Sequence, residues 1–391
     1  MQRIGIYGGA FNPPHLGHVR AAEYAVQALK LDKLLLIPSG TSPHKPLPAG
    51  SPTARQRLEM VRLWAGEKMQ VCDMEIARGG TSYTYETVQQ LKTQYPQDEL
   101  ILCMGTDMFL SFHSWKEPQL ILQNVSLAVF YRGDKGEIAD IAAKKAEYEA
   151  AGHKIYLVEN PVLEISSTQL RRMLVFGCAA PFLHKDVLEF IENNGLYGTR
   201  ENYKNLPIDD LEKVVVNLLH PNRVKHVLGC RDTAADMARV WGADETDAAR
   251  AGLLHDITKA LDGPLQLTLC REYGKVLDEF SENNPKTLHA LTGSMVAERV
   301  FGENEAVVAA IESHTTGKPA MNTLEKIIYV ADYMEPNRDF PGVEELRRLA
   351  YTDLDGALKL GLEMTLAVLR EQKRQISPAS SQALEYLTKG N

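Results

Sequence analysis

The chain begins with the segment Arg3-Ile4-Gly5-Ile6-Tyr7-Gly8-Gly9-Ala10-Phe11-Asn12-Pro13-Pro14-His15-Leu16-Gly17-His18. Its apolar start predicts a buried strand, and Gly8 and Gly9 allow another group to approach the backbone where that strand ends. The helix that follows would offer unpaired N–H groups to an anion. Because His15 and His18 are three residues apart, both side chains can reach the same phosphate. The glycine spacing is that of neither a dinucleotide-binding dehydrogenase nor a P-loop NTPase.

Short apolar runs alternate with helical periodicity through the first half of the chain. Strands are expected over Arg3–Tyr7, Lys33–Pro38, Gln70–Ile76, Leu100–Met104, Ser126–Tyr131 and Lys154–Val158. Helices are expected over Gly17–Lys30, Thr53–Ala65, Thr84–Gln94 and Glu137–Ala150. Alternating helices and almost entirely apolar strands predict a parallel sheet that is covered on both faces.

The second half has a different pattern, in which helical spacing replaces the β-branched runs. Helices are expected over Leu211–Leu219, Arg223–Trp241, Ala248–Lys259, His289–Phe301, Glu303–Ser313, Thr323–Met334 and Asp353–Gln372. The Ser-rich segment 375–383 is expected to lack regular structure before a last short helix. The sequence therefore predicts a multidomain protein, with an α/β domain over 1–197, a polar linker over 198–207 and an all-α domain over 208–391.

The length and the net charge of the chain limit the classes of function that it can have. A chain of 391 residues is long enough for two to three domains. The formal net charge of −8 argues against a dedicated nucleic-acid binder, although a few local donors can still hold a phosphate. The 5 cysteines are scattered without a C-x-x-C pair, and neither a signal-peptide pattern nor a long apolar run is apparent. We therefore expect a cytoplasmic protein with reduced thiols and no membrane partner.

A second motif, Ile165-Ser166-Ser167-Thr168-Gln169-Leu170-Arg171, would place a capped helix start and a guanidinium near a triphosphate. Taken alone, it could be a capping box without function. Together with the first motif, it resembles the nucleotidyltransferase superfamily with the H-x-G-H signature. The resemblance implies a Rossmann-like fold in which His15, His18 and Arg171 are catalytic.

The blocks Thr81-Ser82-Tyr83-Thr84, Met104-Gly105-Thr106-Asp107 and Trp115-Lys116 are similar to those of the bacterial nicotinate mononucleotide adenylyltransferase family. The resemblance implies adenylyl transfer from ATP to nicotinate mononucleotide with Mg²⁺, giving nicotinate adenine dinucleotide and pyrophosphate in NAD biosynthesis. The acceptor could instead be nicotinamide mononucleotide or phosphopantetheine, and this alternative stays open. It also stays open whether Trp115 packs in the core and whether Lys45 is a solvated loop residue. The residues implied in substrate or ATP binding are Gly8, Gly9, Phe11, Lys45, Tyr83, Thr84, Gly105, Asp107, Trp115, Ser166, Ser167 and Thr168.

The helical half carries a set of metal-ligand side chains on or beside apolar helices. These are His226, His255, Asp256, His289, His314 and Asp332. Imidazoles and carboxylates together suit Fe, Mn, Zn or Co better than Ca. The number of ligands suggests two divalent metals about 3.5–4 Å apart, bridged by Asp256. Lys259 would offer positive charge to a phosphate, although any one of these histidines could be a buried structural side chain.

Four segments resemble the YqeK-type HD family: Arg223-Val224-Lys225-His226, Gly252-Leu253-Leu254-His255-Asp256, His314-Thr315-Thr316-Gly317 and Glu325-Lys326-Ile327-Ile328-Tyr329-Val330-Ala331-Asp332-Tyr333-Met334-Glu335-Pro336. The resemblance implies symmetrical hydrolysis of diadenosine tetraphosphate to two ADP at a di-iron centre, with Lys259 as a catalytic residue. A different substrate (guanosine tetraphosphate, a deoxynucleotide or a cyclic dinucleotide) stays open, as does a metal-stabilised module that only binds nucleotides. Whether the chain forms a homo-oligomer also stays open.

Overall fold

The computed structural model describes residues 1–43, 46–131, 135–159 and 165–389. The chain divides into two compact units, Met1–Glu201 and Asn202–Asn391. The division between them lies within the range 198–207.

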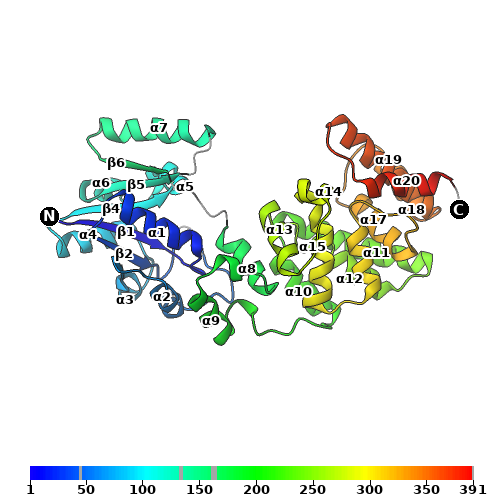
Figure 1. The fold of residues 1–391 in the computed structure, drawn as a ribbon, viewed down its shortest axis with the longest axis horizontal. Helices are drawn as coiled ribbons and strands as arrows, with labels where there is room; N and C mark the ends of the chain where they lie inside the picture. Colours follow the sequence, from blue (N-terminus) through cyan, green and yellow to red (C-terminus); the bar gives the residue numbers. More distant parts are fainter. Residues whose placement is uncertain (44–45, 132–134, 160–164, 390–391) are drawn as a thin grey trace. The chain divides into compact units, whose positions relative to one another are not determined.

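The first unit is built on a parallel sheet (Figure 1). Its 6 strands follow the order β3-β2-β1-β4-β5-β6. They are β1 (Arg3–Gly9), β2 (Lys33–Pro38), β3 (Met69–Val71), β4 (Glu99–Gly105), β5 (Ser126–Tyr131) and β6 (Ile155–Glu159). Gly5 of β1 pairs with Leu34 on one side and Ile101 on the other, both in parallel register. The predicted parallel sheet is confirmed. The strand order reverses between β1 and β4, where open α/β sheets form a crevice for ligands at the carboxyl ends of the strands.

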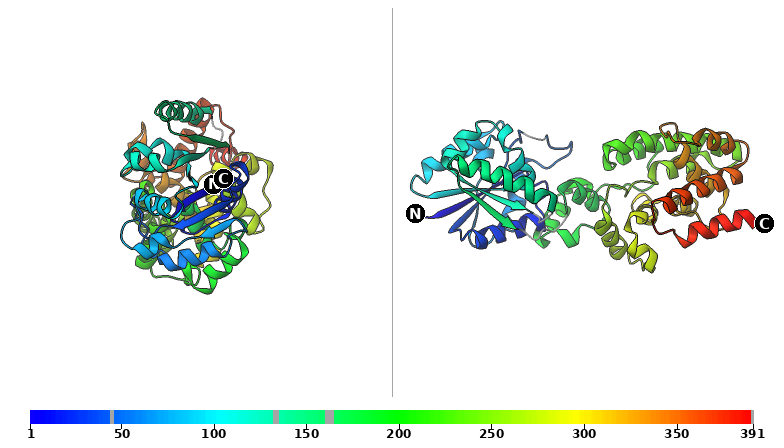
Figure 2. Two further views of the ribbon diagram at one scale, coloured as in Figure 1. Left: turned by 90° about the vertical axis from the view of Figure 1, so that its left-hand side faces the viewer. Right: turned by 90° about the horizontal axis from the view of Figure 1, so that it is seen from above.

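Helices lie on both faces of this sheet (Figures 1 and 2). They are α1 (Leu16–Ala28), α2 (Ala54–Arg62), α3 (Met74–Arg78), α4 (Thr84–Gln94), α5 (Thr106–Leu110), α6 (Pro118–Asn124), α7 (Lys135–Ala150), α8 (Ser167–Val175) and α9 (Lys185–Asn193). Ile4 and Ile6 of β1 share one core with Val88 of α4 and Phe109 of α5. The opposite face is so closely packed at Gly5 that a Cβ atom there would lie 2.5 Å from the side chain of Leu31.

One strand prediction in the first unit is wrong. The strand expected over Gln70–Ile76 ends at Val71, and helix α3 begins at Met74. Asp73 stands at the N-terminal boundary of this helix, and the Met74 side chain is buried in the core. A short helix that buries one apolar side continues the apolar pattern of the strand before it, and this hides the boundary in the sequence.

The second unit is helical throughout its regular structure, as predicted (Figure 1). Its α-helices are α10 (Ile208–Leu218), α11 (Val224–Trp241), α12 (Glu245–Leu254), α13 (Gly263–Glu272), α14 (Glu279–Asn283), α15 (Leu288–Val296), α16 (Glu305–Ser313), α17 (Thr323–Met334), α18 (Val343–Ala350), α19 (Leu354–Glu371) and α20 (Pro378–Lys389). A π-helical turn over Ala297–Phe301 extends α15. Within the described ranges, no helix is long and apolar enough to cross a membrane.

Two predictions in the second unit need correction. The helix expected over Ala248–Lys259 ends at Leu254, and turns follow it. The segment 375–383, expected to lack regular structure, contains the start of α20, where Ser380 and Ala383 are buried. A small-residue segment reads as a loop in the sequence, but burial against neighbouring helices can stabilise it as a helix.

Candidate active sites

The first candidate site lies where β1 ends and α1 begins. His15 immediately precedes α1, and His18 lies within its first turn, so their ring centroids are only 3.8 Å apart. The backbone N–H of His15 donates to His18 Nδ1 at 3.2 Å. His18 Nδ1 is therefore an acceptor, which leaves the proton of the neutral ring on Nε2. The pair thus presents a hydrogen-bond donor without a formal charge.

Burial controls the protonation of both imidazoles. It lowers the pKa of His15 to about 4, and burial together with the neighbouring His15 lowers the pKa of His18 well below its usual value. The Nδ1 atom of His15 is buried and has no hydrogen-bond partner among the described residues. A buried polar atom without a partner is costly, and a ligand atom in the adjoining pocket could supply one.

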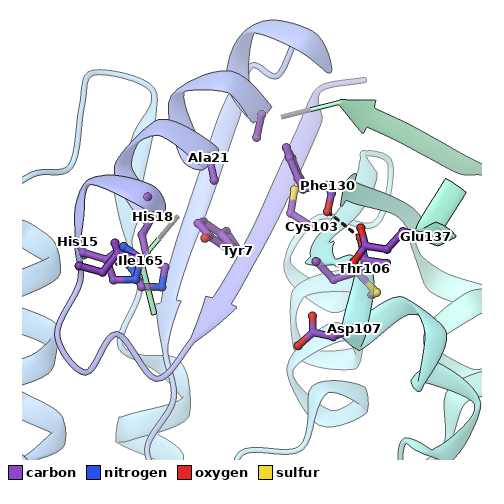
Figure 3. A pocket seen from close by; sticks show the side chains of 14 residues that line it. Tyr7, His15, His18, Ala21, Cys103, Thr106, Asp107, Phe130, Glu137 and Ile165 are labelled. Carbon is purple, nitrogen blue, oxygen red and sulfur yellow. Dashed lines mark hydrogen bonds between the residues drawn. The ribbon is translucent and has the colours of Figure 1, made fainter. Parts of the chain in front are cut away.

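Two pockets meet at this point of the sheet. One has a volume of about 420 Å³ and is lined by both histidines, by Ala21 of α1, and by Thr106 and Asp107 after β4. Figure 3 shows the imidazoles on one side of this pocket and Asp107 on the other. The second pocket, of about 380 Å³, lies along the ends of β1 and β2. Tyr7, Cys103, Met104 and Gly105 line both pockets, so ligands in the two would meet near the ends of β1 and β4.

The glycines at the end of β1 keep the second pocket open. A Cβ atom on Gly8 would meet only the Ile37 carbonyl oxygen, at 3.9 Å, and one on Gly9 would touch the Phe11 ring at 3.4 Å. Phe11 is 2% exposed and lines neither pocket; its ring packs on that of His18, with centroids 5.1 Å apart. Phe11 is thus placed to support the histidine rather than to face a ligand.

The second motif joins the same site. Ser166 caps α8 by accepting a hydrogen bond from the Gln169 N–H, and Thr168 and Arg171 line the second pocket beside Ser167. Arg171 donates to the Asn12 carbonyl oxygen at 2.9 Å, which fixes its guanidinium against the turn between β1 and α1.

Among the aromatic and loop residues singled out in the sequence, Trp115 and Thr84 line the second pocket. Trp115 also packs on Phe112, with ring centroids 5.2 Å apart. Tyr83 lines neither pocket and is instead covered by Lys116, whose Nζ lies 4.1 Å from the ring centroid. Lys45 lies outside the described residues.

Two residues that the sequence did not single out hold this site together. Arg57 of α2 is 1% exposed and donates to the carbonyl oxygens of Ala10, Ser39 and Gly40, at 2.6, 2.7 and 3.0 Å. It therefore ties the loops after β1 and β2 to each other. The Tyr197 hydroxyl donates to Asn12 Oδ1 at 2.8 Å, from a backbone position with φ 58°.

The second candidate site gathers side chains from five helices. His226 lies on α11, His289 on α15 and Asp332 on α17, while His255 and His314 stand at the ends of α12 and α16. Asp256 follows His255 directly and is 1% exposed. The structure thus brings all six sequence-predicted ligands together.

Every histidine of this site is anchored through its Nδ1 atom. His255 Nδ1 lies 2.7 Å from the Gly252 carbonyl oxygen and His314 Nδ1 lies 2.6 Å from that of Ile311. His289 Nδ1 lies 3.0 Å from the Lys286 carbonyl oxygen, and His226 Nδ1 lies 3.1 Å from Glu335 Oε1. An oxygen partner at Nδ1 fixes the proton there and leaves the Nε2 lone pair available to a metal, as is usual for metal-binding histidines.

The two oxygens of Asp256 face different histidines. Oδ2 lies 3.8 Å from His226 Nε2 and 3.6 Å from His255 Nε2. Oδ1 lies 3.5 Å from His289 Nε2 and 3.9 Å from His314 Nε2. A carboxylate between two pairs of imidazoles is the arrangement expected of a bridging ligand in a two-metal site. Asp332 Oδ1 lies 3.0 Å from His226 Nε2 and so joins the histidines that face Asp256 Oδ2.

Positive side chains surround these carboxylates. Arg223 contacts Asp256, and Arg338 donates to Asp332 Oδ1 at 2.7 Å. Lys259 Nζ lies 2.9 Å from His289 Nε2. Burial lowers the pKa of Lys259. Burial alone would raise the pKa of Asp256. The adjoining imidazoles and the Lys259 ammonium outweigh this effect, so the pKa of Asp256 is lowered. Lys259, Arg338 and Asp332 line a pocket of about 360 Å³ beside His289 and His314.

Sequence reasoning also missed Cys230 and Glu335. Cys230 Sγ lies 3.6 Å from His226 Nε2, and Glu335 is buried against the other nitrogen of that ring. Cys230 follows His226 by one helical turn, a spacing that could have pointed to it. Glu335 follows Asp332 by three residues, directly after α17, and this spacing could likewise have pointed to it.

The two halves match different family models. Residues 6–173 match the cytidylyltransferase-like model, and residues 223–337 match the HD domain model. The fold and the sites therefore define a nucleotidyltransferase-type unit followed by an HD-type unit.

Curated relatives give the families. The first half is 36% identical over 213 residues to a probable nicotinate-nucleotide adenylyltransferase of Citrifermentans bemidjiense, covering 50% of this chain and 98% of the relative. The second half is 43% identical over 161 residues to a symmetrical bis(5′-nucleosyl)-tetraphosphatase of Halalkalibacterium halodurans, covering 41% of this chain and 86% of the relative. The second half is also similar to a crystal structure from Clostridium acetobutylicum, described as a predicted HD superfamily hydrolase involved in NAD metabolism. The identity is 38% and the TM-score 0.46, and the match covers 47% of this chain and 98% of that chain. The chain belongs to the nicotinate-nucleotide adenylyltransferase family in its first half and to the symmetrical bis(5′-nucleosyl)-tetraphosphatase family in its second.

Proposed function

We propose that the chain is a bifunctional enzyme whose first unit transfers the adenylyl group of ATP to nicotinate mononucleotide. The observation that carries this proposal is the adjacent histidine pair, with Arg171 of α8 hydrogen-bonded to the turn before α1, where two pockets share a wall. We assign ATP to the pocket lined by Ala21 and Asp107, and the mononucleotide to the pocket lined by Trp115, whose indole face suits a cationic pyridine ring.

The transfer is a direct displacement. An oxygen of the mononucleotide 5′-phosphate forms a bond to the α-phosphorus of ATP, and the bond from that phosphorus to the oxygen bridging to the β-phosphate breaks, so that pyrophosphate leaves with the electron pair. No side chain has to act as nucleophile, because positioning and charge neutralisation supply the rate. His18 would donate from Nε2 to the phosphate oxygens, and Arg171 would neutralise their charge. Mg²⁺ bound with ATP would add further charge neutralisation.

We propose that the second unit hydrolyses diadenosine tetraphosphate symmetrically. The observation that carries this proposal is the set of four Nδ1-anchored imidazoles around Asp256, beside a pocket with two cationic side chains. A water oxygen bonds to one of the two central phosphorus atoms and gives up its protons to solvent. The bond from that phosphorus to the bridging oxygen breaks, one ADP leaves with the bridging oxygen and its electron pair, and the other ADP carries the water oxygen. Lys259 and Arg338 would hold the phosphate oxygens.

The donor set of this unit fits divalent cations, and we propose two iron ions. Such a pair would polarise the phosphate and lower the pKa of a water molecule. His226, His255, Asp256 and Asp332 would hold one ion, and Asp256, His289 and His314 the other. Metal analysis of the chain purified without oxygen tests the identity of the metal: about two iron ions per chain support the proposal, and a stoichiometric complement of another metal contradicts it.

Parallel assays on the full chain test both substrates. Nicotinate mononucleotide, nicotinamide mononucleotide and phosphopantetheine compete as acceptors with ATP, and we expect the first to have the highest kcat/KM. Diadenosine tetraphosphate, guanosine tetraphosphate, a deoxynucleoside triphosphate and a cyclic dinucleotide are compared with Fe²⁺ or Mn²⁺ present. ADP as the sole product from diadenosine tetraphosphate supports the proposal. ATP with AMP, or no turnover of any substrate, contradicts it.

A further inference from the structure

A buried thiol lies inside the metal-ligand cluster of the second unit, and the roles proposed above do not use it. Cys230 is 1% exposed and lies one helical turn after His226 on α11, so both side chains point to the same side. The ligand atoms of His226, Cys230, His255 and Asp332 all lie within 4.8 Å of one another. These donors have the chemistry of a zinc or iron site, and Asp256 Oδ2, 3.8 Å from His226 Nε2, would add a further oxygen.

The distances within this group match shared coordination. Zn–S bonds of about 2.3 Å and Zn–N bonds of about 2.0–2.1 Å, at a tetrahedral angle, place sulfur and nitrogen about 3.6 Å apart. Cys230 Sγ lies 3.6 Å from His226 Nε2. The same reasoning places two nitrogens about 3.3 Å apart, and the Nε2 atoms of His226 and His255 are 3.2 Å apart. The thiol therefore lies where a ligand would lie.

The remaining contacts of the thiol leave sulfur available to a metal. Sγ lies 3.8 Å from the carbonyl oxygen of Ala331, next to Asp332 on α17, a weak contact in which the thiol donates. A coordinated cation removes the thiol proton outright.

We propose that Cys230 is a metal ligand, as a thiolate, at the position formed by His226, His255 and Asp332. The inference rests on the metal centre proposed above and adds a sulfur donor to one of its two positions. Because a thiolate is a soft ligand, this position should prefer zinc to manganese. The other position, formed with His289 and His314, has only nitrogen and oxygen donors.

Cobalt serves as a spectroscopic probe of the sulfur ligand. The full chain is loaded with Co²⁺ to a stoichiometry established by metal analysis, and the near-ultraviolet absorption is recorded. Thiolate coordination produces a sulfur-to-cobalt charge-transfer band. We expect this band in the wild-type chain and in Cys270→Val, whose thiol is buried on α13 outside the cluster. In Cys230→Val the band should be absent, and Zn²⁺ affinity should fall on the order of tenfold or more, with a smaller fall in Mn²⁺ affinity.

The outcomes separate the ligand assignment from the metal centre itself. A cobalt-loaded wild-type chain without the band, or a band that persists in Cys230→Val, overturns the assignment of Cys230 alone. A chain that takes up no cobalt overturns the metal centre as well. Should Cys230→Val fail to fold, X-ray absorption of the zinc-loaded wild-type chain decides, because a sulfur neighbour at about 2.3 Å is distinct from nitrogen and oxygen at about 2.0–2.2 Å.

Discussion

Histidines in the two units are anchored in opposite ways. His18 of the first unit accepts a backbone hydrogen bond at Nδ1, so its proton stays on Nε2. His226, His255, His289 and His314 of the second unit each have an oxygen partner at Nδ1, so their Nε2 lone pair faces the cluster. The first arrangement suits a hydrogen-bond donor to phosphate, and the second suits a metal ligand. The partner of one nitrogen thus determines what the other can do.

Metal removal should give the largest difference between the units. Stripping divalent cations with a chelator should abolish hydrolysis and destabilise the second unit by about 4 kcal/mol, the value for a cation present at a thousand times its Kd. Hydrogen exchange measured by mass spectrometry should show faster exchange in α11, α12 and α17. Exchange in β1 and α1 should not change, because the metal-ligand clusters found among the described residues lie in the second unit; faster exchange there would contradict the comparison.

Glu335 tests the anchoring of a metal-binding histidine. Glu335→Gln removes the charge that holds His226 Nδ1, and the affinity for Zn²⁺ should fall about 10- to 100-fold. Competition titration with a chelating dye measures the Kd. Glu344→Gln is the matched control, because the Glu344 side chain is 82% exposed on α18. Equal affinities for both variants would show that the Glu335 contact does not support the metal centre.

His15 tests the neutral histidine pair. Its folded pKa of about 4 lies below the ordinary value near 6.5, so as the pH falls below 6.5 the unfolded chain binds a proton that the folded chain does not. The first unit should lose about 2 kcal/mol of stability through this residue between pH 7 and 5.

Urea unfolding in a Trp241→Phe background measures this loss, because the remaining tryptophans, Trp64 and Trp115, lie in the first unit. His15→Asn should reduce the pH dependence by that amount, whereas substitution of the exposed His113 by Asn should leave it unchanged. The same pH dependence in wild type and His15→Asn would contradict a neutral, buried His15.

Tyr197 should give the smallest effect. Tyr197→Phe removes one hydrogen bond to Asn12, worth about 1 kcal/mol, and should lower kcat for adenylyl transfer about fivefold. Tyr156→Phe is the control, because the Tyr156 hydroxyl donates to Glu99 at 2.9 Å, at the opposite end of the sheet. A loss of stability in both variants, with a loss of kcat only in Tyr197→Phe, supports a positioning role. An unchanged kcat in Tyr197→Phe would contradict a positioning role for Tyr197.

Local patterns in the sequence predicted much of this fold. The strands around β1 and the helix α4 stand out because apolar spacing and flanking turn residues agree. The end of β3 and the end of α12 could not be predicted, because the apolar pattern continues beyond the point where the backbone changes direction. The start of α20 was missed because burial, rather than composition, stabilises it.

The residues of the candidate sites likewise include some that a local motif predicted and some that it did not. His15, His18 and the HD dipeptide His255-Asp256 stand in compact motifs, and their neighbours in sequence are also their neighbours in space. Arg57 and Tyr197 act through contacts with residues far away in the chain. Their partners are known only once the helices have packed, so no local pattern marks them.

Two substitutions in the full chain test the central claim most directly, namely that each unit carries its own reaction. His18→Ala should lower kcat for adenylyl transfer by about 10²–10³ with little change in KM, because it removes a donor to the transferred phosphate, and should leave hydrolysis unchanged. Asp256→Ala should abolish hydrolysis and metal retention and leave transfer unchanged. Loss of both activities in either variant, with its fold intact by circular dichroism, would contradict two separate active sites.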